Sequence, residues 1–217
     1  MYFKKIVLFF ILAFSSDFAF ATHIVGGEMT YRYVSGNTYS ITLSVYRDDF
    51  NGNPQALFDA PAYIALYDQN GNFVTYYEEY LDVQNNNVAP PINNPCLNQP
   101  NNVRIQKAIY TFNITVPNPN MGYHVVYARC CRNGALINNL LNPDYEGGTY
   151  TAYIPPTNTY HNSSPVFVQD RPPIYVCLNK PITFDHSATD LNGDSLYYSF
   201  CSPIKGLDQN GPAIDQG

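Results

Sequence analysis

Alternating apolar and polar side chains, interrupted by Asn-Gly turns, constrain the fold of this chain more than any other feature of its sequence. The clearest case is the stretch 181–202, PITFDHSATDLNGDSLYYSFCS. Ile182, Phe184, His186 and Ala188 alternate with polar residues, which is the period of a half-buried strand. The Asn-Gly that follows suits the positive φ angles of a tight turn, and the alternation then resumes. We therefore predict a β-hairpin here, with an acidic turn between two strands.

The same alternation recurs through most of the chain. Only 13% of the residues are charged, and 20 Tyr accompany no Trp, so the composition favours strands over helices. Seven or so strands with turn signals between them are typical of a β-sandwich. We predict an all-β protein: an immunoglobulin-like β-sandwich followed by the start of a second cadherin- or immunoglobulin-like unit. The predicted strands of the first unit cover residues 23–33, 38–47, 62–67, 73–83, 105–116, 123–131 and 149–154.

The N-terminus has the features of a secretory signal peptide. Lys4 and Lys5 form a basic region, residues 6–14 are apolar, and residues 19–21, Ala-Phe-Ala, fit a cleavage site. The apolar run is too short to span a bilayer, which needs about 20 residues, and no later run is long enough. We expect export through the Sec pathway, a mature chain that begins at Thr22 in an oxidising compartment, and no transmembrane segment in that chain.

Proline pairs and turn residues suggest a division of the mature chain. We predict a β-sandwich domain over 22–156, a Pro-rich junction over 157–173 and an incomplete second immunoglobulin- or cadherin-like unit over 174–217, after a signal peptide over 1–21. A complete sandwich takes about 100 residues, more than remain after the junction. We therefore expect the chain to be an N-terminal fragment of a longer protein, or to depend on something that is absent from it.

The sequence contains five cysteines, at positions 96, 130, 131, 177 and 201. Outside the cytosol they are expected to pair, and an odd number leaves one free or intermolecular. We favour a bridge between Cys177 and Cys201 within the second unit. Cys130 and Cys131 are predicted to point to opposite faces of a strand, with Cys130 as the buried partner of any bridge in the first unit. Cys96, in the Asn-rich stretch 84–102, is a further candidate, and the connectivity stays open.

Four stretches share the pattern D-x-N-G, beginning at Asp49, Asp68, Asp190 and Asp208. An Asp side chain can cap the backbone amides of such a turn, and Asn-Gly supplies its left-handed residues. The EF-hand calcium pattern is not met, because the sixth-position Gly and the distant Glu are missing.

The third of these turns carries the most oxygen ligands. Three carboxylates and an amide lie within ten residues there and would repel each other unless a turn spreads them or a cation neutralises them. If any metal binds, we expect calcium, held by Asp185, Asp190, Asn192 and Asp194.

Other chemistry is sparse in this sequence. A net charge of −6 gives no electrostatic reason to expect nucleic acid as a partner. The sequence contains no G-x-S-x-G nucleophile elbow and no phosphate-binding Gly-rich loop. The four His, at positions 23, 124, 161 and 186, are scattered and are predicted to be strand or loop residues. We expect no catalytic activity.

Two pairs of segments carry a resemblance to known proteins. Residues 162–167, NSSPVF, and 188–199, ATDLNGDSLYYS, resemble the start of a cadherin-like or related immunoglobulin-like module. Together with residues 22–31, THIVGGEMTY, and 127–133, YARCCRN, they resemble the N-terminal region of large secreted surface proteins of gliding-type Bacteroidota. Those proteins carry PKD or immunoglobulin-like modules and end in a gliding-motility-associated type IX sorting domain. The match covers nearly all of the mature chain, which shows no such sorting domain.

These observations together predict an exported, non-catalytic module of the cell surface or extracellular space that acts in adhesion or as a structural spacer. The alternative is a carbohydrate-binding protein whose sugar platform consists of exposed tyrosines such as Tyr76, Tyr77 and Tyr80. The expected partner is therefore an extracellular protein or a glycan.

Overall fold

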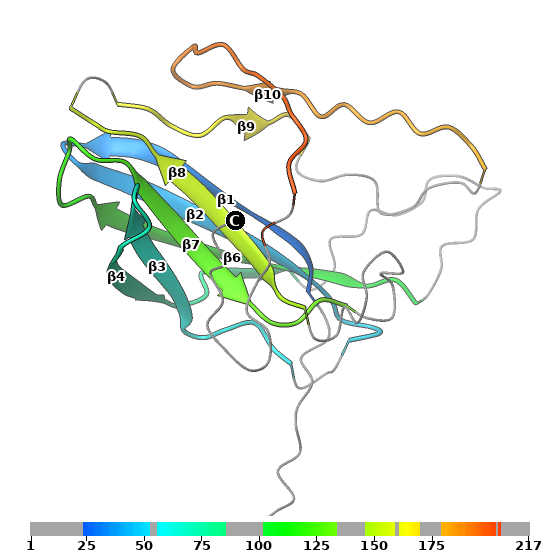
Figure 1. Cartoon of the computed structure of the whole chain (residues 1–217). Helices are drawn as coiled ribbons and strands as arrows, with labels where there is room; N and C mark the ends of the chain where they lie inside the picture. Colours follow the sequence, from blue (N-terminus) through cyan, green and yellow to red (C-terminus); the bar gives the residue numbers. More distant parts are fainter. Residues whose placement is uncertain are drawn as a thin grey trace, which may run out of the picture.

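The computed structural model describes residues 24–52, 56–85, 102–133, 146–158, 161–169, 179–202 and 204. These residues form strands and no helix, so the all-β prediction is confirmed. Two four-stranded antiparallel sheets lie face to face as an immunoglobulin-like β-sandwich (Figure 1). In the part of the chain that is described, no helix is long and apolar enough to cross a membrane.

The first sheet has the strand order β1-β2-β6-β5. Its strands are β1 (Ile24–Ser35), β2 (Thr38–Asp48), β6 (Ile105–Thr115) and β5 (Val83–Asn85). β1 and β2 form a hairpin closed at Gly36, whose φ of 55° is the left-handed conformation that glycine adopts without strain. The register of this hairpin shifts between Ile24 and Gly26, which is a β-bulge or a similar irregularity just before the Gly26-Gly27 pair.

The second sheet has the order β4-β3-β7-β8. Its strands are β3 (Ala62–Asp68), β4 (Phe73–Glu79), β7 (Tyr123–Arg129) and β8 (Gly148–Ile154). The turn between β3 and β4 forms as predicted: the Asp68 carboxylate accepts hydrogen bonds from the backbone N–H groups of Asn70 and Asn72, both at 2.9 Å. β7 lies inside the sheet, which explains why it is apolar on both faces.

The core lies between the inner faces of the two sheets. β2 contributes every second residue, because successive side chains of a strand point to opposite faces. The facing positions of β3 and β6 follow the same period, so the alternation read from the sequence identifies the apolar core residues of these three strands. Those residues are Tyr39, Ile41, Leu43 and Val45 of β2, Ala62, Ile64 and Leu66 of β3, and Ala108, Tyr110, Phe112 and Ile114 of β6.

The predicted strand over 73–83 is wrong in its second half. β4 ends at Glu79, and the chain then crosses to the other sheet, where β5 pairs with β6. Asp82 makes this crossing, since its N–H donates to the carbonyl of Ile109 at 3.0 Å and its carboxylate accepts from the N–H of Thr111. A polar residue that binds the backbone of the other sheet ends the alternation at this point.

The hairpin predicted over 181–202 is also wrong. Within that stretch the only described strand is β10 (Ala188–Thr189), and it pairs with β9 (Val166–Phe167). The residues predicted as the second strand of the hairpin contact the first through a side chain: the hydroxyl of Tyr198 accepts a hydrogen bond from the N–H of Ala188 at 2.9 Å. An alternating pattern fixes the period of a strand but not its partner.

The segment 161–164 lies along the edge strand β1. Ser164 exchanges two bonds with Tyr31: its N–H donates to the Tyr31 carbonyl at 2.8 Å, and its hydroxyl accepts from the Tyr31 N–H at 2.9 Å. The Ser163 hydroxyl accepts from the N–H of Tyr33, whose ring stacks on His161 at 4.1 Å between centroids. The segment thus covers part of an edge that would otherwise be open to pairing with another chain.

We predict that adjacent residues of β3 differ sharply in their contribution to stability. Ile64→Ala should lower the free energy of unfolding by about 2–5 kcal/mol, because Ile64 is fully buried. Tyr63→Ala should cost no more than about 1 kcal/mol, because Tyr63 lies on the outer face. Urea unfolding monitored by circular dichroism measures both values. Similar losses for the two variants would mean that the inner and outer faces are assigned wrongly.

Candidate functional site

The outer face of the second sheet is unusually aromatic. The alternation that buries Ile64 and Leu66 turns Tyr63, Ala65 and Tyr67 outward. Tyr63 is 58% exposed, and Tyr76 on the neighbouring strand is 55% exposed. An outer face normally carries polar side chains, so exposed rings at these positions indicate a surface that binds something.

The register of the strands brings these rings together. Tyr67 is paired with Phe73 of β4 on one side and with His124 of β7 on the other, and His124 is paired with Tyr153 of β8. One aromatic ring from each of the four strands therefore lies in a single row across the sheet. The ring centroids are 5.7 Å apart for Tyr67 and Phe73 and 4.7 Å apart for His124 and Tyr153.

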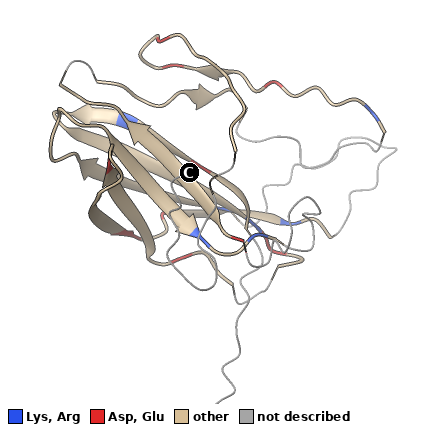
Figure 2. Cartoon of the chain, in the orientation of Figure 1, with Lys and Arg blue, Asp and Glu red and all other residues tan. Residues whose placement is uncertain are grey.

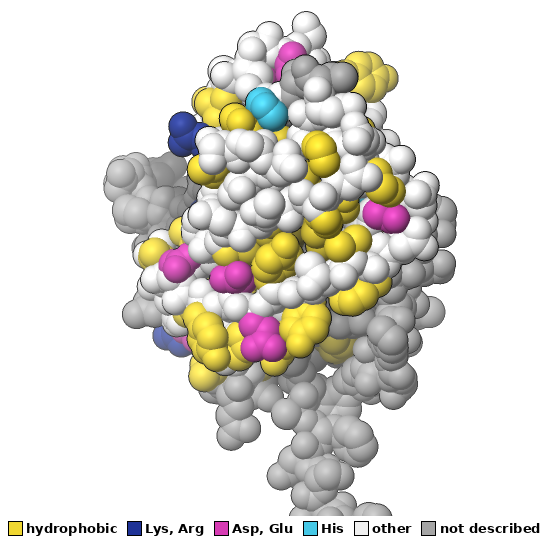
Figure 3. Space-filling model, turned by 90° about the vertical axis from the view of Figure 1, so that its left-hand side faces the viewer, with side chains coloured by type: hydrophobic (Ala, Val, Ile, Leu, Met, Phe, Trp, Pro, Cys, Tyr) yellow, Lys and Arg dark blue, Asp and Glu magenta, His cyan; other side chains and the backbone are white. Residues whose placement is uncertain are grey.

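A second contact extends this surface, because the rings of Tyr63 and Tyr76 lie 6.0 Å apart. We call the whole set the aromatic face. Figure 3 shows the side of the molecule on which β3 and β4 lie, where hydrophobic side chains form a band with acidic side chains among them. The aromatic face consists of Tyr63, Tyr67, Phe73, Tyr76, His124 and Tyr153.

A hollow of about 420 Å³ opens beside these rings, between β3 and β7. The two strands pair only from Ala65 to Asp68, although β7 continues to pair with β8 as far as Arg129. Ala65, Val126 and Ala128 line the hollow with small side chains, while Tyr63 and Tyr67 stand at its sides. We call this the β3–β7 hollow, and its volume lies within the range of roughly 300–1,000 Å³ that is usual for ligand sites.

A polar network closes one end of the hollow. The Asp59 carboxylate accepts a hydrogen bond from the hydroxyl of Tyr127 at 2.6 Å and pairs with the guanidinium of Arg129 at 3.2 Å. The backbone carbonyl of Asp59 accepts from the hydroxyl of Tyr110 at 2.7 Å. The Arg129 side chain is 11% exposed whereas that of Asp59 is 35% exposed, so the carboxylate is the more open charge of the pair.

Burial keeps both tyrosines protonated. It raises the pKa of Tyr110 to about 12, with a further contribution from the negative charge of Asp59. Burial also raises the pKa of Tyr127, again with Asp59 as the next cause. Both phenols therefore act as hydrogen-bond donors to Asp59 and do not act as bases near neutral pH.

Two arginines anchor the segment that carries Asp59. Arg129 donates to the carbonyl of Leu57 at 2.6 Å, and Arg47 donates to the carbonyl of Ala56 and lies over the ring of Phe58, 5.2 Å from its centroid. Figure 2 shows both signs of charge at this end of the sandwich, where β7 ends. The segment is consequently held in place from two sides, which fixes the position of the carboxylate.

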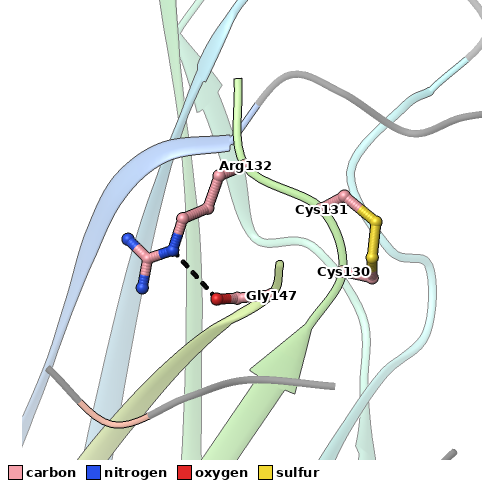
Figure 4. Close-up of a disulfide and its surroundings, with 4 residues drawn as sticks. All are labelled: Cys130, Cys131, Arg132 and Gly147. Atoms are coloured by element: carbon pink, nitrogen blue, oxygen red, sulfur yellow. Dashed lines mark hydrogen bonds between the residues drawn. A yellow bond between two sulfur atoms is a disulfide. The ribbon is translucent and has the colours of Figure 1, made fainter. Parts of the chain in front are cut away.

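A disulfide between Cys130 and Cys131 lies at the same end (Figure 4). Cys130 lines the hollow and is half-buried, while Cys131 is buried at 2% exposure. Just beyond, Arg132 donates from Nε to the carbonyl of Gly147 at 2.9 Å, which ties the segment to the chain before β8. The prediction of opposite faces, with Cys130 buried, is wrong because β7 ends at Arg129 and its alternation does not reach the cysteines.

The other cysteine predictions have different outcomes. Cys201 is exposed and free, so the expected bridge between Cys177 and Cys201 is not formed. Cys177 itself and Cys96 lie outside the described residues.

The tyrosines proposed as a sugar platform do not share one surface. Tyr76 belongs to the aromatic face, and Tyr80, just after β4, is 66% exposed. Tyr77 points inward instead, where it packs against the core with its ring 5.9 Å from that of Phe112. The alternation of β4 explains the difference, since Tyr76 and Tyr77 are consecutive residues of one strand.

Three of the four proposed calcium ligands, Asp185, Asp190 and Asn192, use a side-chain oxygen in a hydrogen bond to a backbone N–H group. The Asp190 carboxylate accepts from the N–H groups of Asn192 and Asp194, and Asp185 accepts from the N–H of Ser187. The side-chain oxygen of Asn192 accepts from the N–H of Ser163 at 2.9 Å. Among the described residues no group of three His, Cys, Asp or Glu side chains is placed to hold a metal ion. Calcium binding stays a prediction without support from this geometry.

The other acidic turns follow the same chemistry with one change. At the first copy the preceding residue, Asp48, caps the N–H groups of Phe50 and Asn51, while Asp49 pairs with the guanidinium of Arg47. The copy that begins at Asp208 lies outside the described residues.

Sequence reasoning missed most of the candidate site. It identified Tyr76 but not the hollow, Asp59 or the outward rings of β3. One signal was available: the predicted strand over 62–67 places Tyr63 and Tyr67 at positions that face solvent if Ile64 faces the core. Asp59 precedes the strand in a segment without regular structure, and no pattern in the sequence indicates its partners.

Comparisons with known proteins give no match: no protein-family model fits the chain, and searches of the curated proteins and of the solved structures find none either.

We predict that the cysteines at 130 and 131 bridge to each other in the native protein. Trypsin cleaves after Arg129 and Arg132, so the oxidised protein should yield the tripeptide Cys-Cys-Arg, unalkylated and lighter by two hydrogen atoms than its dithiol form. Mass spectrometry after alkylation without reduction tests this. Cys201 should be alkylated in the same experiment, which provides the internal control. Recovery of either cysteine joined to a peptide from elsewhere in the chain would contradict the prediction.

We also predict that Asp190→Ala lowers stability to the same extent with and without calcium. The change removes two capping bonds, each worth about 1 kcal/mol. Thermal melts of the wild type and the variant in excess calcium and in chelator measure the effect. A bound ion would raise the melting temperature of the wild type alone, because a ligand that binds only the native state stabilises it. That result would restore the calcium prediction.

Proposed function

We propose that this protein is an exported, non-catalytic adhesion module of the cell surface or extracellular space, and that it binds its partner through the aromatic face. The observation that carries this proposal is the row of Phe73, Tyr67, His124 and Tyr153, one ring from each strand of the second sheet. A module that served only as a spacer would not need exposed rings on that face. Adhesion is therefore favoured over a purely structural role.

The chemistry of the face favours a glycan as the partner. Sugar rings present C–H groups that pack against aromatic faces, because an aromatic ring is negative over its face and positive at its edge. The hollow beside Tyr63 and Tyr67 adds depth to a surface that would otherwise be flat. Exposed aromatic rings with a few polar groups are also the composition of protein interfaces, so an extracellular protein is the second candidate.

The location of the protein is inferred from the sequence alone. The N-terminal basic and apolar segments support export, and the resemblance to secreted surface proteins of Bacteroidota supports a place at or outside the cell surface. The vicinal cysteine bridge is compatible with an oxidising compartment, where disulfides persist.

Binding to an array of glycans tests the proposal. The wild type should bind at least one class of glycan, and Tyr63→Ala combined with Tyr76→Ala should weaken that binding at least about tenfold, as expected when exposed aromatic contacts are truncated. Tyr197→Ala is the matched control, since Tyr197 is 92% exposed but lies outside the second sheet.

The result of the array also separates the candidate roles. An array without signal, combined with binding to a protein partner that the double variant loses, would favour the protein ligand. Equal binding by wild type and double variant to every partner found would contradict the aromatic face as the binding surface.

A further inference from the structure

We propose that the β3–β7 hollow takes a single neutral sugar ring, and that the site discriminates against sugars that carry a carboxylate. This inference rests on the proposed function, because it names the chemical class of glycan that the aromatic face would hold. It depends on the shape of the hollow, on the hydrogen-bonding groups at its end and on the charge of the surrounding strands.

The floor and sides of the hollow suit a flat ring with an apolar face. Ala65, Val126 and Ala128 are small, so they leave a depression in the sheet. Tyr63 and Tyr67 are four residues apart on one strand, which separates them by about 13 Å at 3.3 Å per residue. A ring lying on Ala65 would therefore contact an aromatic side chain on either side.

The polar end of the hollow suits hydroxyl groups. Asp59 is partly exposed and can accept bonds from hydroxyls that the ligand donates. A sugar hydroxyl can donate to Asp59 without adding charge to the site.

The charge of the sheet argues against an acidic ligand. On the outer face of the second sheet one acidic side chain, that of Glu78, lies beside the hollow, and the basic residue of these strands is Arg129. The charge of Arg129 is already paired with Asp59, and Glu78 is paired in register with Tyr63 at the side of the hollow. Burial lowers the pKa of His124, so this ring does not supply a positive charge near neutral pH. A carboxylate placed in the hollow would lie near the carboxylates of Glu78 and Asp59, while Arg129 is already paired.

A matched pair of ligands tests the inference. The probes are an oligosaccharide of a neutral hexose and its uronic-acid counterpart, which differ by the carboxylate at C6, together with neutral N-acetylhexosamine and galactose oligomers. Affinities are measured by isothermal titration calorimetry on the full chain. We expect at least one neutral probe to bind, and its uronic-acid counterpart to bind at least about tenfold more weakly because of like-charge repulsion.

Two variants locate the ligand in the hollow. Ala65→Leu fills the floor and should weaken neutral-sugar binding at least about tenfold. Thr151→Leu should leave it unchanged, because Thr151 is an exposed outward residue of β8 paired in register with Val126 and does not line the hollow. Asp59→Asn should reduce the preference for neutral over acidic sugars, a readout that mere loss of folding would not give, and thermal melts of each variant confirm its fold.

The outcomes distinguish this inference from the proposed function. Glycan binding that survives Ala65→Leu, or that favours the uronic acid, would overturn the inference and leave the aromatic face intact as a glycan surface. Absence of binding to every sugar would overturn the inference and leave a protein partner as the ligand of the aromatic face. Neutral-sugar binding that Ala65→Leu abolishes and Thr151→Leu retains would support both.

Discussion

The burial of one face of each sheet against the other is the constraint on which the rest of the structure depends. Strands alternate their side chains, so burying Ile64 and Leu66 of β3 commits Tyr63, Ala65 and Tyr67 to the opposite face. A shift of one residue in the register would bring those tyrosines into the core and turn the isoleucine and leucine to solvent. The position of every ring on the aromatic face is thus a consequence of core packing.

The polar end of the hollow depends on a second feature, the early separation of β3 from β7. Pairing between the two strands begins at Ala65 of β3 and Val126 of β7, so the start of β3 and the end of β7 are separated. Asp59 and its partners Tyr127 and Arg129 lie at the end of the space between them. An ionised carboxylate near the core is tolerated only when it is hydrogen-bonded and paired, and here a phenol and a guanidinium meet both needs. Because the Asp59 carboxylate stabilises this open end of the sheet and remains partly exposed, it is also available to a ligand.

The sequence predicted the sandwich well because its strands are long and strongly alternating. β2 and β6 were predicted nearly to their ends, and every second residue of β2 from Tyr39 to Val45 is buried in the core. The errors share one cause: periodicity says nothing about which strand becomes the partner. The residues on both sides of the acidic turn at Asp190 alternate well, yet β10 pairs with β9 and not with the residues after the turn. The side chain of Asn192, in the turn, binds the segment 161–164 instead.

The site was harder to predict than the fold, for a related reason. Tyr76 and Tyr77 are indistinguishable by composition, and only the partner strand decides that one faces solvent while the other packs on Phe112. Asp59 and the cysteine pair lie just outside the strands, where alternation carries no information.

The division between the two faces of the second sheet also separates stability from recognition. The residues that hold the sandwich together point inward, and those of the aromatic face contribute little to the core, so ligand-facing side chains can change without unfolding the protein. Rigid strands keep the rings in fixed register, which reduces the conformational entropy lost when a ligand binds. Asp59 is the exception, because it belongs to both sets: it neutralises Arg129 beneath the hollow and presents its exposed oxygen to whatever enters from above. A substitution there would be expected to change folding and recognition together, whereas changes at Ala65 or Tyr63 would act on recognition alone.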